Sequence, residues 1–127
     1  MSGATRLTKI LLISVFLVAS ACDDMKIMKI AADGNNPPTF KLSGYTFNYL
    51  YVSDEKGRKV WEINREGSGE LVTSLIYGNL PTGYKETVPP EPLVEGQTYV
   101  IRAGAASGHT VPGELRFTVG KPSQAAQ

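Results

Sequence analysis

Short runs in which apolar and polar residues alternate occupy most of the chain between residues 39 and 119. In residues 113–119 every second residue is apolar, which places Leu115, Phe117 and Val119 together on one face of a strand. Related runs cover residues 39–43, 45–53, 59–63, 70–78 and 98–105. No stretch holds a sustained helical repeat of apolar residues, and most of the 13 glycines and 8 prolines lie between the runs. The pattern therefore predicts about seven short strands, which is typical of a β-sandwich.

The alternation also predicts which side chains face the core. Trp61 and Ile63 are expected to share one face of a strand, with Trp61 between the two sheets. Residues 45–53 carry apolar side chains in both phases, so their inward face stays open. Gly57 lies between two runs, at the position where a hairpin turn needs a positive φ. The other expected inward side chains include Phe40, Leu42, Tyr99, Ile101 and Ala103.

One local motif narrows the fold class. Residues 93–101, LVEGQTYVI, resemble the corner between strands E and F of fibronectin type III and related immunoglobulin-like domains. The resemblance implies that the Tyr99 hydroxyl bonds to upstream backbone, that Leu93 packs beside it and that Gly96 makes the turn. The expected fold class is therefore all-β: an immunoglobulin-like (fibronectin type III-like) antiparallel β-sandwich of about seven strands, following a cleaved N-terminal signal peptide.

The first 21 residues have the pattern of an export signal and are set apart from the fold. Arg6 and Lys9 precede an uncharged run over residues 10–20, which is shorter than the roughly 20 apolar residues of a membrane-spanning helix. Small residues then lead to Cys22, the only cysteine of the chain. Cleavage before Cys22 would make it the first residue of the mature protein. A plain secretory signal and an uncleaved N-terminal helix are the alternatives.

The residues around Cys22 indicate where in the cell the protein is located. Residues 19–22, ASAC, resemble the lipobox of bacterial lipoproteins, which implies a covalent diacylglycerol and an N-acyl lipid on Cys22. Two or three acyl chains would hold a soluble domain on a membrane almost permanently. Asp23 and Asp24 resemble the signal that keeps enterobacterial lipoproteins on the inner membrane. The resemblance therefore favours the periplasmic face of the inner membrane over the outer membrane.

Cleavage leaves three further segments. Residues 22–38 are expected to form a tether, either wholly flexible or including an edge strand, with a reach of about 22 Å as a flexible chain. Residues 39–120 are expected to form the β-sandwich domain, and residues 121–127 a disordered tail. Loss of Arg6 and Lys9 leaves acidic and basic residues nearly balanced, and this excludes the basic footprint of a nucleic-acid-binding protein.

The sequence offers little that could carry catalysis. His109 is the only histidine, and its segment ASGHTVPG is typical of a loop between the last two strands. One histidine and an acylated cysteine leave too few ligands for a transition-metal site. No nucleophile elbow, phosphate-binding glycine loop or calcium loop occurs, although sequence order alone leaves a Ser–His–acid arrangement open. We expect a protein that is not an enzyme and needs no metal or diffusible cofactor.

Two features could carry binding. The proline-rich residues 79–96 are interpreted either as a rigid connection or as a docking edge with Tyr84 exposed at its tip. The chain also has 6 tyrosines, more than one face of a sandwich can bury, and exposed tyrosines suit interfaces with proteins or sugars. The candidate binding residues are Tyr77, Tyr84 and His109.

Together these observations predict a membrane-anchored lipoprotein that presents a small, non-catalytic β-sandwich to a protein partner in the cell envelope. The membrane is contacted through the lipid, nucleic acid is not a partner, and the oligomeric state is left open. The alternative is a lipoprotein that binds a glycan or another small ligand. That alternative would place Tyr45, Tyr49 and Tyr77 on one solvent-exposed face.

Overall fold

The computed structural model describes residues 26–43, 46–67, 71–105 and 110–121, and these residues form strands, turns and loops without a helix. The strands are β1 (Lys26–Ile27), β2 (Lys29–Ala32), β3 (Thr39–Ser43), β4 (Tyr49–Asp54), β5 (Lys59–Arg65), β6 (Ser74–Ile76), β7 (Tyr84–Val88), β8 (Thr98–Gly104), β9 (Thr110–Val111) and β10 (Gly113–Thr118). Within this described part, no helix is long and apolar enough to cross a membrane.

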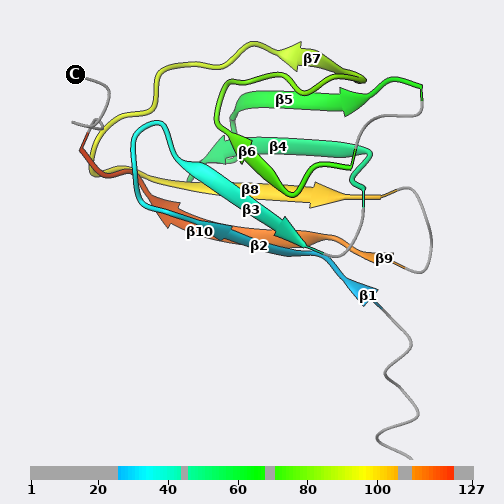
Figure 1. Ribbon diagram of the computed structural model, residues 1–127. Coiled ribbons are helices and arrows are strands. Elements are labelled where there is room, and N and C mark those ends of the chain that lie inside the picture. The colour runs from blue at the N-terminus through cyan, green and yellow to red at the C-terminus, as the bar shows by residue number, and fades with distance from the viewer. Residues whose placement is uncertain (1–25, 44–45, 68–70, 106–109, 122–127) are drawn as a thin grey trace, which may run out of the picture.

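The strands form two antiparallel sheets that lie against each other (Figure 1). One sheet has five strands in the order β10-β8-β4-β5-β7, and the other has three in the order β2-β3-β6. The short β1 and β9 pair with each other in parallel. The predicted all-β, sandwich-like architecture is therefore confirmed, and residues 70–78 contribute only the three-residue β6 to it.

The core lies between the two sheets and contains the side chains that the alternation placed inward. Phe40 of the three-stranded sheet meets Phe117 of the five-stranded sheet edge to face, with 5.2 Å between ring centroids. The side chains with no exposed surface are Phe40, Phe47, Leu50, Val52, Trp61, Ile63, Ile101 and Ala103. The expected position of Trp61 between the sheets is therefore confirmed.

Strand pairing settles the inward face of β4, which the sequence left open. Leu50 and Val52 lie opposite buried residues of both β5 and β8, so these two side chains enter the core. The alternate residues, Tyr49 and Tyr51, consequently point to the outer face of the five-stranded sheet.

The β4–β5 hairpin turns at Gly57, as the sequence predicted. Gly57 has a φ of 85°, in the left-handed region that favours glycine. The Asp54 carboxylate accepts hydrogen bonds from the backbone N–H of Lys56 (2.9 Å) and Arg58 (3.0 Å). The turn is therefore held by its own side chain, as is typical of aspartate.

The segment before β8 shows the contacts that the corner motif implies. The Tyr99 hydroxyl accepts a hydrogen bond from the Val94 N–H at 3.0 Å, and Gly96 turns the chain with a φ of 82°. Leu93 and Tyr99 are both buried. The corner therefore ties the loop before β8 to the strand itself.

Replacement of Tyr99 by phenylalanine is expected to lower the free energy of unfolding by about 1 kcal/mol, because the partly buried Val94 N–H loses its acceptor. Urea unfolding followed by circular dichroism measures the change. Tyr51→Phe, on the outer face, is the control and should stay within about 0.5 kcal/mol of the wild type. Equal losses for both variants would contradict the role of the corner.

Of the two alternatives left open for residues 22–38, the structure shows the one with strand structure, and residues before 39 pack against the domain. Strands β1 and β2 occupy residues 26–27 and 29–32, and β2 pairs with β3. Met28 between them is 1% exposed, and its N–H donates to the Val111 carbonyl at 3.1 Å. A Cβ on Gly113 would lie 2.5 Å from the Met28 carbonyl oxygen, so only glycine allows this close approach. Most of the expected tether is thus part of the folded domain.

Candidate functional site

The residues singled out in the sequence fall into two groups. Cys22, Asp23, Asp24 and His109 lie outside the described residues. Tyr77 and Tyr84 are described, and both are core residues with 7% and 6% exposure. The expectation that these two tyrosines contribute to a binding surface, with Tyr84 exposed at a tip, is therefore corrected: their side chains do not reach the surface.

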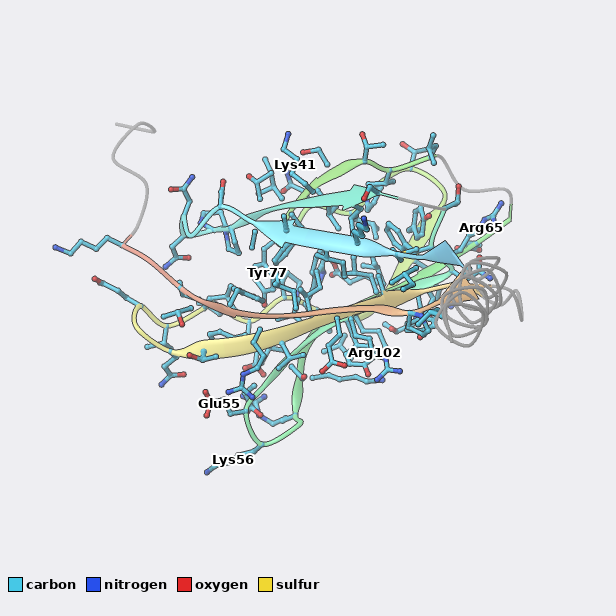
Figure 2. The ribbon with its side chains drawn as sticks, turned by 90° about the horizontal axis from the view of Figure 1, so that it is seen from below. Lys41, Glu55, Lys56, Arg65, Tyr77 and Arg102 are labelled. Carbon is cyan, nitrogen blue, oxygen red and sulfur yellow. The ribbon has the colours of Figure 1, made fainter. Side chains whose placement is uncertain are left out.

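Tyr77 lies between the layers of the sandwich (Figure 2). Its hydroxyl is 2.7 Å from the Glu91 carbonyl oxygen and 3.2 Å from that of Val60, and it can donate to either. Its ring meets Trp61 edge to face at 5.1 Å. Burial is tolerated because the polar end of tyrosine finds backbone acceptors there.

Tyr84 is buried because it begins β7 and faces inward. Its hydroxyl donates to the Phe47 carbonyl at 2.9 Å, and its ring lies 4.7 Å from that of Phe47. The side chain therefore links β7 to the segment before β4.

Burial raises the pKa of the Tyr77 phenol above its ordinary value, and burial also raises that of Tyr84. In the unfolded chain tyrosine has a pKa near 10. The contribution of the two neutral phenols to the free energy of unfolding is therefore fully present below about pH 10 and is lost as the pH rises further. The free energy of unfolding should therefore fall above about pH 10, and the fall should be shallower in Tyr77→Phe. Urea unfolding at several alkaline pH values measures both slopes, and parallel slopes would contradict the prediction.

The proline-rich connection is fixed to the sheet at Glu91. The Glu91 N–H donates to the Val60 carbonyl at 3.0 Å, while its own carbonyl lies beside Tyr77. Its carboxylate forms two hydrogen bonds with Arg58, at 2.6 and 3.0 Å, and these lower the pKa of Glu91. These contacts hold the residues around Glu91 rigidly. Residues 79–96 are nevertheless more than the connection expected from the sequence, because β7 lies within them and pairs with β5.

The outer face of the five-stranded sheet brings together two tyrosines and four charged side chains. We call it the tyrosine face; it consists of Tyr49, Tyr51, Lys59, Glu62, Arg102 and Glu114. Its residues come from four neighbouring strands, and the register places Glu114, Arg102, Tyr51 and Glu62 in one row across them.

The two tyrosine rings are the centre of this face. Tyr49 and Tyr51 stack with 6.2 Å between centroids and 19° between ring planes. The Lys59 ammonium lies 4.7 Å from the centroid of the Tyr51 ring, which is a cation–π distance. Tyr49 lies across Gly104 of β8, where an added Cβ would come within 2.5 Å of the tyrosine hydroxyl oxygen. Gly104 therefore makes room for the ring on the sheet surface.

Charged side chains flank the rings on both sides. Arg102 has a raised pKa, chiefly because of the neighbouring Tyr49 hydroxyl and then Tyr51, and its guanidinium lies 3.7 Å from the Glu114 carboxylate. Lys59 and Glu62 form an ion pair at 2.6 Å. Partial burial works to raise the pKa of Glu62, but hydrogen bonds from Lys59 and Thr87 lower it on balance. The face thus presents aromatic rings between paired charges.

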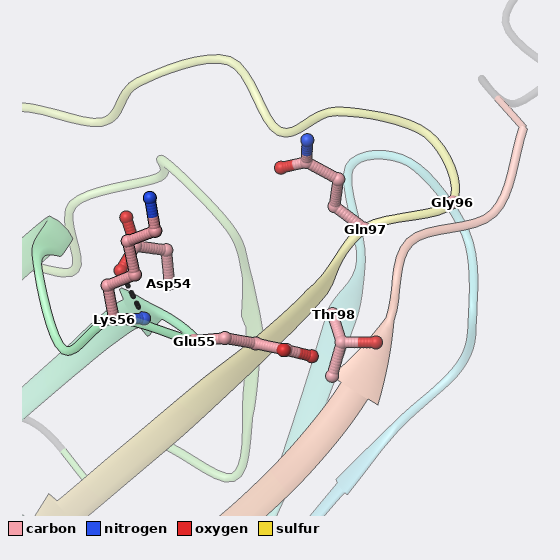
Figure 3. Close-up of a pocket in the computed structure, with 6 residues that line it drawn as sticks. All are labelled: Asp54, Glu55, Lys56, Gly96, Gln97 and Thr98. Atoms are coloured by element: carbon pink, nitrogen blue, oxygen red, sulfur yellow. Dashed lines mark hydrogen bonds between the residues drawn. The ribbon is translucent and has the colours of Figure 1, made fainter.

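A shallow pocket of about 450 Å³ lies at the end of the domain that carries the β4–β5 turn (Figure 3). Its lining residues are Asp54, Glu55, Lys56, Gly96, Gln97 and Thr98. The Asp54 carboxylate is committed to the turn, and the backbone N–H of Arg58 is the main cause of its lowered pKa. Glu55 reaches across β8 toward Thr98. The side chains that line the pocket are polar or charged, which suits the binding of a polar group.

The tyrosine face was missed by sequence reasoning, which named Tyr45, Tyr49 and Tyr77 as the exposed set that would favour glycan binding. Tyr45 lies outside the described residues and Tyr77 is buried. A signal was present, since the outward phase of residues 45–53 holds Tyr49 and Tyr51, two residues apart. Among the described residues, no group of three or more His, Cys, Asp or Glu side chains is arranged to hold a metal ion. The chain matches no protein-family model, no curated protein and no solved structure.

Proposed function

We propose that this chain is a lipid-anchored, non-catalytic β-sandwich that docks a protein partner in the cell envelope through its tyrosine face. The observation that carries the proposal is the stacked pair Tyr49 and Tyr51 beside Arg102 on the outer face of the sheet. Tyrosine and arginine are enriched in protein interfaces, where a few such residues supply most of the binding energy. The paired charges around the rings would form the polar rim.

The proposed anchor is Cys22, acylated in the manner of the lipobox family, on the periplasmic face of the inner membrane. An anchor of this kind confines the domain to two dimensions and raises its effective concentration near a membrane partner. A moderate contact area on the sheet would then be sufficient for association.

Photo-crosslinking in intact cells tests the proposal. A benzophenone amino acid replaces Tyr51 in one version and Lys41 in the other; Lys41 is exposed on the opposite sheet, which makes it a matched control (Figure 2). Both versions keep the signal segment and Cys22. We expect position 51 to form a crosslinked product of defined mass with one envelope protein. Position 41 should form no product of that mass.

Adducts of the same masses from both positions, or from neither, would contradict docking through the tyrosine face. A purified partner then allows a direct measurement: Tyr51→Ala should weaken binding by at least about 1 kcal/mol, while Lys41→Ala should leave it unchanged.

We also infer that the sandwich belongs to the immunoglobulin-like, fibronectin type III-like class. The corner contact between Tyr99 and the Val94 N–H supports this assignment. The strand order departs from the immunoglobulin fold at one point. In that fold, strand E before the corner and strand F after it lie in opposite sheets. Here β7, before the corner, pairs with β5 in the same sheet as β8. An experimental structure with the strand order β2-β3-β6 against β10-β8-β4-β5 would support it.

Binding of a glycan is the second candidate, and the half-buried tyrosine pair on the outer face favours it because sugar rings stack on aromatic side chains. Screening the purified protein against a glycan array, with Tyr51→Ala as control, separates it from the first candidate. Binding that is lost in Tyr51→Ala would favour the glycan.

A further inference from the structure

The folded domain starts very close to the proposed anchor. Only residues 23–25 separate Cys22 from Lys26, the first residue of β1. Four residue steps of extended chain span at most about 14 Å. The polar head-group layer on one side of a bilayer takes up about 6 Å of that length. The remaining length of about 8 Å is less than half of the roughly 19 Å between the edge strands of the five-stranded sheet, so the domain stays close to the lipid.

The tether cannot lengthen at the expense of the first strands without breaking core contacts. Strand β1 pairs with β9, and the N–H of Met28 bonds the Val111 carbonyl. The Met28 side chain is 1% exposed and belongs to the hydrophobic core. The chain is thus held to the domain from its first described residues.

The end of the domain that carries β1 also exposes two large apolar side chains. Leu71 is 70% exposed and Ile27 is 58% exposed, the two highest values among the large hydrophobic side chains of the described residues. Strand pairing places Ile27 and Leu71 at the same end of the domain. Lys29 of β2 pairs with Ser43, the last residue of β3, so Ile27 lies beyond the end of β3. The Leu42 N–H bonds the Thr73 carbonyl, so the residues before Thr73 also extend beyond the end of β3. Strands β3, β5 and β8 all run toward this end (Figure 1).

We propose that this end of the sandwich rests on the lipid surface, with Ile27 and Leu71 in contact with the head-group region. The proposal deepens the proposed function and rests on it, because it takes Cys22 as the acylated residue. The tyrosine face then points sideways along the membrane, toward a neighbour on the same bilayer. The β4–β5 turn and the pocket beside it point away from the membrane.

Site-specific fluorescence in vesicles tests this orientation. Ile27→Cys, Leu71→Cys and Lys56→Cys each add one thiol to the full chain, whose own single cysteine is acylated if the proposed function holds. Lys56 lies in the exposed β4–β5 turn and serves as the distal control. The lipidated proteins are labelled with an environment-sensitive dye and placed in phosphatidylethanolamine–phosphatidylglycerol vesicles that contain head-group spin-labelled lipid.

We expect several-fold stronger quenching at positions 27 and 71 than at position 56. A flexible glycine–serine insert of about 20 residues between Asp24 and Met25 adds about 25 Å of reach and should lower the quenching at both positions toward the distal value. Equal quenching at the three positions, or quenching that the insert leaves unchanged, would overturn the proposal.

The same samples separate this inference from the proposed function. Two reactive thiols per chain and no sedimentation with the vesicles would overturn the lipid anchor and the orientation together. One reactive thiol with full sedimentation, but equal quenching at the three positions, would overturn the orientation alone.

Discussion

Replacement of Trp61 by alanine is expected to lower the free energy of unfolding by about 3–5 kcal/mol, the largest loss that a single core substitution should cause here. Trp61 has no exposed surface and meets Tyr77 edge to face. Its indole N–H also donates to the Glu86 carboxylate at 3.2 Å. Small domains have only about 5–15 kcal/mol of stability in total, so the substitution should remove a large share of it.

Urea unfolding followed by far-ultraviolet circular dichroism measures this loss, because the variant has no tryptophan fluorescence. Leu71→Ala is the matched control: it also removes a large apolar side chain, but one that is 70% exposed, and it should change the free energy of unfolding by less than about 0.5 kcal/mol. A loss below about 1 kcal/mol for Trp61→Ala would contradict the prediction, because it would show that the indole contributes little to packing between the sheets.

Replacement of Cys22 by serine is expected to abolish fatty-acid attachment completely, because serine has no thiol to receive diacylglycerol. Cells fed an alkyne-bearing palmitate should label the wild type and leave Cys22→Ser unlabelled. In the lipobox family cleavage follows acylation, so the variant should also keep residues 1–21 and migrate as a larger chain. Asp24→Asn, which keeps the thiol, is the control and should be labelled like the wild type.

The same experiment distinguishes the two alternative interpretations of the N-terminus. A plain secretory signal predicts a wild type that is cleaved but carries no fatty acid. An uncleaved N-terminal helix predicts a wild type that carries no fatty acid and keeps residues 1–21. Either result would also remove the basis of the membrane orientation proposed above.

The sequence predicted most accurately where one strand face is apolar and the other is polar. Phe40 and Leu42 of β3 and Phe117 and Val119 near the chain end were placed inward, and all four are buried. A strand with one apolar face has a single favourable orientation, so its pattern is sufficient to assign the core. The position of the hairpin turn at Gly57 was also predictable from local sequence, because the turn requires a residue with a positive φ.

The prediction was wrong for two tyrosines outside the corner motif. Tyr77 and Tyr84 were expected at a binding surface because tyrosine often lies at interfaces. Their burial depends on carbonyl acceptors from Val60, Glu91 and Phe47, which lie 14 to 37 residues away in sequence. No local pattern reveals such partners, because the satisfaction of a buried hydroxyl is a property of the packed structure.

By itself, then, the sequence determined the all-β class, the inward residues of the one-sided strands and the hairpin at Gly57, while the contacts of Tyr99 were implied by the resemblance of residues 93–101 to a known corner motif. Each depends on backbone geometry or alternation within a few residues. Only the tertiary structure decided that Tyr49 and Tyr51 share an outer face with Arg102, and that residues 26–32 pair as strands of the domain. Those features depend on which strands pair and in which register, and pairing between distant segments is selected by the energy of the whole core.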